Sequence, residues 1–249
     1  MSSALRIWPF NYPAFPRIAL FSLQVKDIVE RDMPQAEEWL ACAMTSRRKE
    51  FAAGRICSAA ALQALGGDSM WPPIAKPYRY PKFPKAFKGS ITHTQECALA
   101  CVGDAERYLA IGLDAEPMVE HAELEQMANH VLSPPELNQF IKMDRERALT
   151  FFYLCFSAKE TLFKTLFPLC HTDMEFTESE LTAWDDEGCF TLRLVTDRVS
   201  DRFENGTLFR GLWSVHADTL LTLLALPRKQ ALPTLDSQLY MPDFSYGRP

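Results

Sequence analysis

The chain has 249 residues, of which 47% are hydrophobic and 12% aromatic, so it can bury one large core or two smaller ones and is not disordered as a whole. Its formal net charge of −6 argues against general nucleic-acid binding. Seven cysteines without a C-x-x-C pair indicate reduced thiols rather than a disulfide framework or a zinc site.

The chain begins with a proline-broken, aromatic segment that lacks the pattern of a signal peptide. No later run reaches the roughly 20 apolar residues of a membrane span, so we expect a cytoplasmic protein. A strand is expected at 18–25 and a helix at 35–65. Arg48 and Arg55, seven residues apart, project from similar sides of this helix. Both can be solvated, but the small residues around Arg55 let a ligand approach closely, which slightly favours an anion site.

A proline-rich basic loop follows at 68–89 and leads into a strand that starts with GSITHT. Lys76 lies in this loop, and Ser90 and His93 stand at the mouth of the strand. A lone histidine is more often structural than chemical. Here it follows a basic loop and lies beside hydroxyl groups, which makes it a reasonable phosphate ligand.

Two acidic residues end the next strand, RYLAIGLDAEP. Asp114 and Glu116 are two positions apart and therefore point to the same face. Two carboxylates on one face repel unless a cation lies between them, and such oxygen ligands suit Mg²⁺ better than zinc. A solvent-facing acidic strand end is the alternative. Glu160, on a later helix, supplies a third carboxylate for a Mg²⁺ site.

The segment 151–164, FFYLCFSAKETLFK, predicts a densely apolar helix that carries three charged residues. Lys159 falls inside the apolar arc of the helical wheel, so it needs an acidic partner or an anion nearby. Glu160 and Lys164, four residues apart, lie at the margin of this arc and can point into a common space. The alternative is that Glu160 and Lys164 form a surface ion pair and that Lys159 extends its ammonium to solvent. The apolar residues on both sides make this alternative less favourable.

The remaining segments predict the domain layout. Residues 118–149 are expected to be helical with a break at LSPPEL, and strands are expected after Pro168. Each half then combines helices and strands, which predicts an α+β fold of two similar α/β subdomains in a pseudo-twofold arrangement, with a cleft between them. The expected boundaries are 1–110 for the N-terminal subdomain, 111–232 for the C-terminal subdomain and 233–249 for a tail.

Three motifs, GSITHT, IGLDAEP and FSAKETLFK, occur in the order and approximate separation found in the 4′-phosphopantetheinyl transferases. The chain resembles this family over residues 45–165. RKEFAAGR and the Lys76 to Pro81 segment are most similar to its large monomeric members, of the enterobactin-synthetase and surfactin type. Ala115, Thr161 and Tyr78 depart from the family pattern, but none of these departures removes a charged group.

The resemblance implies the transferase fold, with a cofactor cleft between the subdomains, and a reaction. Such enzymes transfer the phosphopantetheine arm of coenzyme A to a serine of apo acyl or peptidyl carrier proteins, for fatty-acid, polyketide or nonribosomal peptide (siderophore) synthesis. The resemblance implies Mg²⁺ as a cofactor, coenzyme A as a substrate and a monomeric enzyme. Glu160 and Lys164 would be catalytic, and Asp114, Glu116 and Glu160 would hold Mg²⁺. The expected coenzyme A ligands are Arg48, Arg55, Lys76, Ser90, His93, Asp114, Lys159 and Lys164.

Two alternatives from other classes remain at this stage: another Mg²⁺-dependent nucleotide phosphohydrolase and a non-catalytic carrier-protein-binding module. Two surfaces can receive an acidic carrier protein. One is the basic loop between Lys76 and Lys88, and the other is an apolar surface near Leu124, Met127 and Val131. We expect the apolar surface, because part of the basic loop is needed for phosphates.

Overall fold

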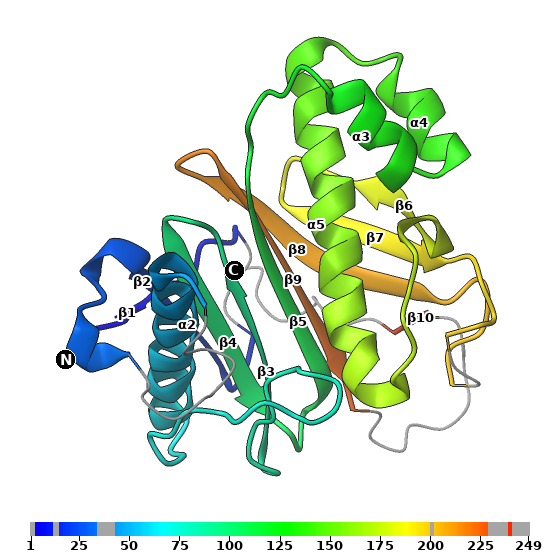
Figure 1. Ribbon diagram of the computed structural model, residues 1–249. Helices are drawn as coiled ribbons and strands as arrows, with labels where there is room; N and C mark the ends of the chain where they lie inside the picture. Colours follow the sequence, from blue (N-terminus) through cyan, green and yellow to red (C-terminus); the bar gives the residue numbers. More distant parts are fainter. Residues whose placement is uncertain (1–2, 12–14, 34–42, 200–201, 229–238, 241–249) are drawn as a thin grey trace, which may run out of the picture.

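The computed structural model describes residues 3–11, 15–33, 43–199, 202–228 and 239–240 (Figure 1). The N-terminal half is built on an antiparallel sheet with helix α2, Thr45–Ala64, packed on β2 and β4. The helix expected at 35–65 is thus found in its larger part, and positions 35–42 lie outside the described residues. The strand order is β1 (Leu5–Arg6), β2 (Ile18–Gln24), β4 (Cys97–Asp104) and β3 (Phe87–His93), with the 3₁₀ helices η1 (Val25–Asp27) and η2 (Glu30–Asp32) after β2.

A second sheet forms the C-terminal half, and the long helix α5, Arg145–Cys170, crosses β5 and β9 of this sheet (Figure 1). Two shorter helices, α3 (Leu124–Val131) and α4 (Pro134–Phe140), precede α5, and the 3₁₀ helix η3 (Phe176–Glu178) follows it. The antiparallel strand order is β5 (Tyr108–Pro117), β9 (Thr219–Pro227), β8 (Leu208–His216), β7 (Cys189–Leu194) and β6 (Ser179–Trp184), and β10 (Leu239–Tyr240) pairs with β8 in parallel.

Local sequence signals explain where these helices begin. Ser133 caps α4 by accepting a hydrogen bond from the Glu136 backbone N–H, while the Glu136 carboxylate accepts one from the Ser133 N–H, as the SPPE pattern predicts. Asp144 caps α5 in the same way, accepting from Arg147 N at 3.0 Å. Helix α5 is therefore longer at both ends than the 151–164 segment that its apolar pattern marks.

The two halves form similar α/β subdomains, each an antiparallel sheet with a long helix on one face, which confirms the expected α+β fold. An apolar cluster joins the sheets, with Leu20 and Leu99 from the first sheet and Leu113 and Leu223 from the second. The subdomains also meet where β3 lies beside β5. This contact brings the strand of GSITHT against the strand of IGLDAEP.

The boundaries expected at 110 and 232 stay predictions, although the change from one sheet to the other falls between β4 and β5. Of the expected tail, only Leu239–Tyr240 is described, and these two residues pair with β8; the rest of the tail lies outside the described residues. None of the helices in the described ranges combines the length and the apolar character that crossing a membrane requires.

Candidate active site

The candidate site lies where β3, β5, α5 and the loop that precedes β3 come together. A pocket of about 320 Å³ at this junction takes its lining from both subdomains, with Tyr78 and Ser90 on the first side and Phe163 and Lys164 on the second. A neighbouring pocket of about 420 Å³ lies against α2 and shares Arg79, Pro81 and Ile91 with it. A ligand with two separate binding groups can therefore extend from α2 to α5.

Asp114 is the most deeply buried acid of this junction, with 2% of its surface exposed. Its Oδ1 accepts hydrogen bonds from Lys164 Nζ at 2.5 Å and from Thr92 Oγ1 at 3.1 Å. Its Oδ2 is buried and has no hydrogen-bond partner in the described part of the chain. A buried carboxylate oxygen without a donor is costly, so it marks a place where a cation or donor can bind.

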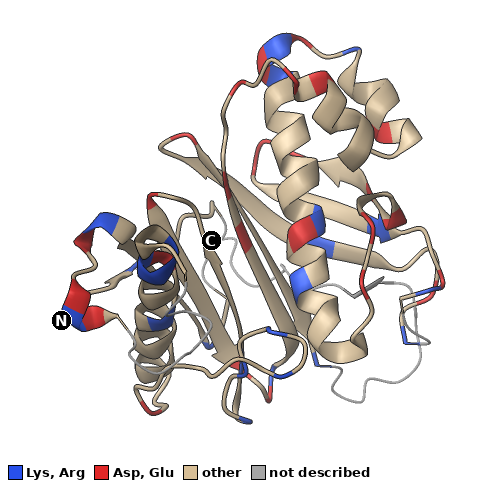
Figure 2. Cartoon of the chain, viewed as in Figure 1, with Lys and Arg blue, Asp and Glu red and all other residues tan. Residues whose placement is uncertain are grey.

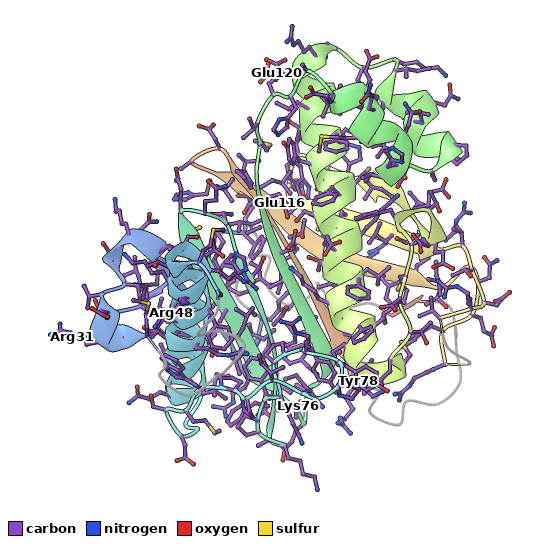
Figure 3. All side chains as sticks on the ribbon, in the orientation of Figure 1. Arg31, Arg48, Lys76, Tyr78, Glu116 and Glu120 are labelled. Atoms are coloured by element: carbon purple, nitrogen blue, oxygen red, sulfur yellow. The ribbon has the colours of Figure 1, made fainter. Side chains whose placement is uncertain are left out.

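Glu116 and Glu160 lie near Asp114 and carry perturbed acidities. Burial raises the pKa of Glu116 to about 7, and the Asp114 and Glu160 carboxylates add to the rise. Burial likewise raises the pKa of Glu160, with a further contribution from Asp114 and an opposing one from Lys164. Acidic positions on β5 lie beside charged positions on α5 (Figure 2), and Glu116 is labelled on this strand in Figure 3. The three carboxylates therefore influence one another, as the sequence predicts.

Within the ranges that the structure describes, no group of three or more His, Cys, Asp or Glu side chains is arranged to hold a metal ion. The three carboxylates are thus close enough to interact electrostatically without forming a ready-made three-ligand cluster. The donor set still fits a hard divalent cation, because such an ion would give the buried Asp114 Oδ2 a partner and offset the burial and the carboxylate repulsion that raise the pKa of Glu116. The Mg²⁺ assignment stays a prediction.

The position of α5 over β5 depends on close backbone contact at Gly112. A methyl group at this position would lie 2.2 Å from both Thr161 O and Thr165 Oγ1, so only glycine lets the helix come this near. On the same side of the helix, Thr161 Oγ1 and Ser157 Oγ lie 2.7 and 2.8 Å from Thr222 Oγ1 of β9. These contacts hold the Glu160 and Lys164 segment of α5 against the sheet that carries Asp114.

The pocket beside α2 is lined by the cationic side chains of Arg47 and Arg55 and by the imidazole of His93. Arg47 contacts the His93 Nε2 atom and pairs with Glu50 Oε2 at 3.1 Å, and Glu50 Oε2 lies 3.6 Å from His93 Nδ1. Arg55 is 5% exposed, and its guanidinium lies 4.6 Å from the centre of the Phe51 ring. Burial and the Arg47 charge lower the pKa of His93. This pocket is suited to a phosphate group.

Arg47 was missed by sequence reasoning, which selected Arg48 from its seven-residue spacing to Arg55. Arg48 does not line the pocket, but its Nε is buried and has no hydrogen-bond partner among the described residues (Figure 3). It therefore stays a candidate anion ligand. The sequence did contain a signal for Arg47, because it stands next to Arg48 in TSRRKE and adjacent arginines on a helix can both approach one ligand.

Ser90 and Lys76 occupy different environments near the junction. Ser90 is buried, donates to Leu113 O at 3.5 Å and lines the pocket shared by the two subdomains. Lys76 is exposed on the loop and lines neither of the two pockets (Figure 3). Next to it, Tyr78 stacks on His171 at the end of α5, with ring centres 4.2 Å apart, so the loop is attached to the second subdomain.

Lys159 lines neither of the two pockets, and its assignment to the coenzyme A ligands stays a prediction. Its ammonium is buried and donates to Glu136 Oε2 at 2.6 Å and to Val131 O at 2.8 Å, on the side of α5 that faces α3 and α4. The expectation that this lysine needs an acidic partner is confirmed. The partner is a protein carboxylate, which favours a structural role for Lys159.

The structure packs much of the apolar surface expected near Leu124, Met127 and Val131 against its own core, and the use of this surface for docking stays a prediction. Val131 is 5% exposed, and Leu124 and Met127 are half-buried against the core of the second subdomain. The apolar face of α3 is therefore used for packing under the molecule's own helices. Little of it remains for a partner.

Known proteins match this chain along most of its length. A model described as the 4′-phosphopantetheinyl transferase N-terminal domain matches residues 35–103, and one of the 4′-phosphopantetheinyl transferase superfamily matches residues 110–215. The chain is 32% identical over 206 residues to the 4′-phosphopantetheinyl transferase Svp of Streptomyces mobaraensis, which covers 80% of each chain.

Two further relatives have the same described activity. The match to the 4′-phosphopantetheinyl transferase PptT of Mycobacterium tuberculosis is 30% identical over 199 residues, covering 78% of this chain and 86% of the relative. The match to the 4′-phosphopantetheinyl transferase Npt of Nocardia iowensis is 31% identical over 204 residues, covering 77% of this chain and 88% of the relative.

Proposed function

This chain belongs to the 4′-phosphopantetheinyl transferase superfamily, and we propose from that premise that it modifies a serine of apo acyl or peptidyl carrier proteins with the phosphopantetheine arm of coenzyme A. The serine oxygen forms a bond to the phosphorus next to pantetheine, and the pyrophosphate bond breaks. Adenosine 3′,5′-bisphosphate leaves, and the hydroxyl proton passes to a base. Carriers of fatty-acid, polyketide and nonribosomal peptide (siderophore) synthesis are the candidate partners.

The acidic junction is the proposed centre for the pyrophosphate. Asp114, Glu116 and Glu160 are the residues that would hold Mg²⁺, which when bound neutralises charge on the pyrophosphate. Lys164 lines the pocket shared by the two subdomains and pairs with Asp114, so its ammonium can donate to a pyrophosphate oxygen. The observation that carries this assignment is the Lys164 and Asp114 pair beside the unpartnered Asp114 Oδ2, at the contact between the two subdomains.

Glu160 is the proposed general base. Its pKa is raised by burial, so it is a stronger proton acceptor than an ordinary exposed carboxylate. It lies on the same helix as Lys164, one turn away, so the base and the phosphate-binding cation share one rigid element. Once the serine oxygen attacks, Glu160 takes the hydroxyl proton directly or through a water molecule.

The nucleotide end of coenzyme A is proposed to bind in the pocket beside α2. Arg55 and His93 line this pocket, and Arg47 joins them as a ligand that the structure adds to the predicted set. Arg48 and Lys76 stay proposed ligands, although neither lines the pocket, and Ser90 stays proposed because it lines the adjoining pocket at α5. The separation of phosphate ligands into two adjoining pockets fits a molecule with a 3′-phosphate and a pyrophosphate.

The subgroup and domain limits are proposals of the same kind. We place the chain among the large monomeric transferases of the enterobactin-synthetase and surfactin type, supported by its two consecutive subdomains in one chain. The proposed subdomains are 1–110 and 111–232, and the gap between the two matched family models, 103 to 110, supports this boundary. Light scattering of the purified protein tests the monomer.

The deciding experiment is intact mass spectrometry of a panel of apo carriers incubated with this protein, coenzyme A and Mg²⁺. A gain of one phosphopantetheine on an acyl, a polyketide or a peptidyl carrier confirms the reaction and ranks the partners. Coenzyme A incubated without a carrier provides the control. Release of adenosine 3′,5′-bisphosphate under that condition, with no modified carrier in the panel, would identify a phosphohydrolase instead.

A further inference from the structure

Lys159 and Glu160 are neighbours on α5 but face different parts of the molecule. Consecutive helical residues are separated by about 100° around the axis. The Lys159 ammonium points to Glu136 and Val131, whereas the charge of Glu160 is felt by Asp114 and Glu116 at the candidate site. Whatever fixes the direction of Lys159 therefore also fixes the rotation of the helix that presents Glu160.

Glu136 is fully buried and connects three elements through its two carboxylate oxygens. Its Oε2 accepts from Lys159 Nζ at 2.6 Å and from Ser133 N at 2.7 Å, and its Oε1 accepts from Leu181 N at 2.6 Å. The carboxylate thus ties α5 to the start of α4 and to β6. Neither β6 nor α4 contributes a residue to the candidate site, so the connection reaches the site only through α5.

Glu160 itself has no such anchor. In the described part of the chain, its side chain makes no hydrogen bond and no ion pair, although it is partly buried. On the sheet side, the Thr161 hydroxyl contacts Thr222 of β9 at 2.7 Å. The helix segment is consequently held from two sides, by a hydroxyl contact with the sheet and by the Lys159 ion pair on the side of α3 and α4.

We propose that Glu136, acting through Lys159, is a positioning residue that sets the rotation of α5 and so directs Glu160 toward the reacting serine. The proposal rests on the role of Glu160 in the proposed function. A buried ion pair contributes little net stability compared with apolar residues of similar volume, because desolvation of the charges offsets their attraction. Its value lies in geometry, since the ammonium reaches both Glu136 and Val131 O with α5 in its observed rotation, and turning the helix would carry it away from them.

The test uses two variants that remove the pair without leaving an unpaired ammonium. Lys159→Met keeps the Glu136 bonds to the backbone N–H groups of Ser133 and Leu181, and Glu136→Gln/Lys159→Met removes both charges at similar side-chain volume. The single change Glu136→Gln is avoided, because it would leave a buried ammonium with no carboxylate partner, whereas the carboxylate left buried in Lys159→Met keeps two backbone N–H donors; the double variant, which leaves no buried charge of the pair, checks that single variant for loss of stability.

Glu180→Gln is the matched control. Glu180 is a buried acid in the same corner, where it accepts from Ser133 Oγ at 3.3 Å and pairs with Arg193, but it makes no hydrogen bond or ion pair with α5 in the described residues. All variants are compared by thermal unfolding, coenzyme A binding stoichiometry and steady-state transfer to a carrier that the wild-type enzyme modifies.

A positioning role requires kcat to fall at least about tenfold in both pair variants while KM for coenzyme A changes less than about twofold, since misplacing a base removes only transition-state interactions. The control should keep kcat. Unchanged kcat in a folded pair variant would overturn the proposal. So would an equal loss in Glu180→Gln, or failure of both pair variants to fold, since either marks the pair as a stability element. A wild-type enzyme that modifies no carrier would instead refute the proposed function.

Discussion

Lys164 Nζ lies 2.5 Å from Asp114 Oδ1, which joins the C-terminal third of α5 to the second half of β5 by a single ion pair. The lysine is partly exposed to the pocket, while the aspartate is almost fully buried. The pair therefore presents a cation to a ligand and keeps one carboxylate oxygen, Asp114 Oδ2, available for another interaction. Both properties are needed where a pyrophosphate meets a hydroxyl group.

Asp114→Asn and Glu160→Gln are expected to lower kcat by at least about a hundredfold, as loss of one preorganised charged group does in comparable sites. Neither change alters side-chain volume, so circular dichroism should stay at the wild-type spectrum. Glu120→Gln, on the exposed segment after β5, is the control and should keep its activity (Figure 3). Turnover of Asp114→Asn near the wild-type rate in Mg²⁺ would show that the acidic junction is not the reaction centre.

Much of this junction could be predicted from local patterns. Period-two alternation placed Asp114 and Glu116 on one face of a strand, and helical periodicity placed Lys159 in an apolar arc and Lys164 at its margin. What periodicity cannot supply is the partner across space. Glu136, the partner of Lys159, lies 23 residues away on another helix, and its sequence signal was that of a helix cap.

The choice between neighbouring arginines also exceeds what a pattern can decide. Arg48 and Arg47 are seven and eight residues before Arg55, so each lies about two helical turns away, on overlapping sides of α2. The position of β3 favours Arg47, because His93 meets Arg47. The apolar face of α3 shows the same limit. Its residues can be identified as apolar from the sequence, but which other elements pack over them depends on the tertiary structure.

Gly112→Ala tests the close approach of α5 to β5. The added methyl group would collide with Thr161 O and Thr165 Oγ1, so α5 must shift away from Asp114 and the protein should lose about 1–3 kcal/mol of stability. The expected result is a lower melting temperature together with a loss of kcat in the folded fraction.

Gly211→Ala is the matched control for that variant. Its methyl group would lie 2.2 Å from the Phe190 ring, within the second subdomain and away from the candidate site. Thermal unfolding should show a similar destabilisation, but transfer per folded molecule should stay at the wild-type level. Equal loss of transfer in the two variants would mean that the Gly112 contact has no special effect on the site.

Arg47→Ala and Arg55→Ala are each expected to raise KM for coenzyme A about tenfold or more, the usual effect of losing a hydrogen bond to a charged group. If these side chains bind the 3′-phosphate, 3′-dephospho-coenzyme A should show a much smaller rise. Arg31→Ala, an exposed position outside both pockets, serves as the control (Figure 3). Equal losses with both substrates would assign the two arginines to another phosphate or to the fold.

His93 is expected to take up a proton when coenzyme A binds. Burial and Arg47 lower its pKa below the ordinary 6.5, against the opposing charges of Glu50 and Asp114, while Lys164 lowers it further. The imidazole is therefore neutral in the free enzyme at pH 7, and its contribution to stability falls as the pH drops below 6.5. A phosphate dianion in the pocket would raise this pKa again.

Calorimetry at pH 6.5 in two buffers of different ionisation enthalpy measures that proton uptake. The wild-type enzyme should take up more protons on binding coenzyme A than the His93→Gln variant. Because the phosphate itself titrates with a second pKa of about 6 in both proteins, the difference between them reports the imidazole alone. His121→Gln, on an exposed segment, should behave as the wild type. The same proton count in His93→Gln and the wild type would remove His93 from the phosphate site.

The last prediction concerns the carrier protein. With the apolar face of α3 largely packed into the core, the exposed lysines of the loop before β3 become the expected contact for an acidic partner, and Figure 2 shows basic residues along this loop. Lys82 and Lys85 are exposed and line neither the pocket beside α2 nor the one at α5. Their reversal in Lys82→Glu/Lys85→Glu should raise KM for the carrier without changing KM for coenzyme A.

The dependence of the carrier KM on salt distinguishes docking on the charged loop from docking on an apolar surface. Exposed charges are screened over about 8 Å at physiological ionic strength, so KM for the carrier should rise with salt in the wild type and rise less in the charge-reversed variant. Lys26→Glu/Arg31→Glu makes the same change in net charge at exposed positions on η1 and η2, and it should retain the wild-type salt dependence. A carrier KM that is insensitive to salt in the wild type, measured with coenzyme A saturating, would exclude the loop as the docking surface.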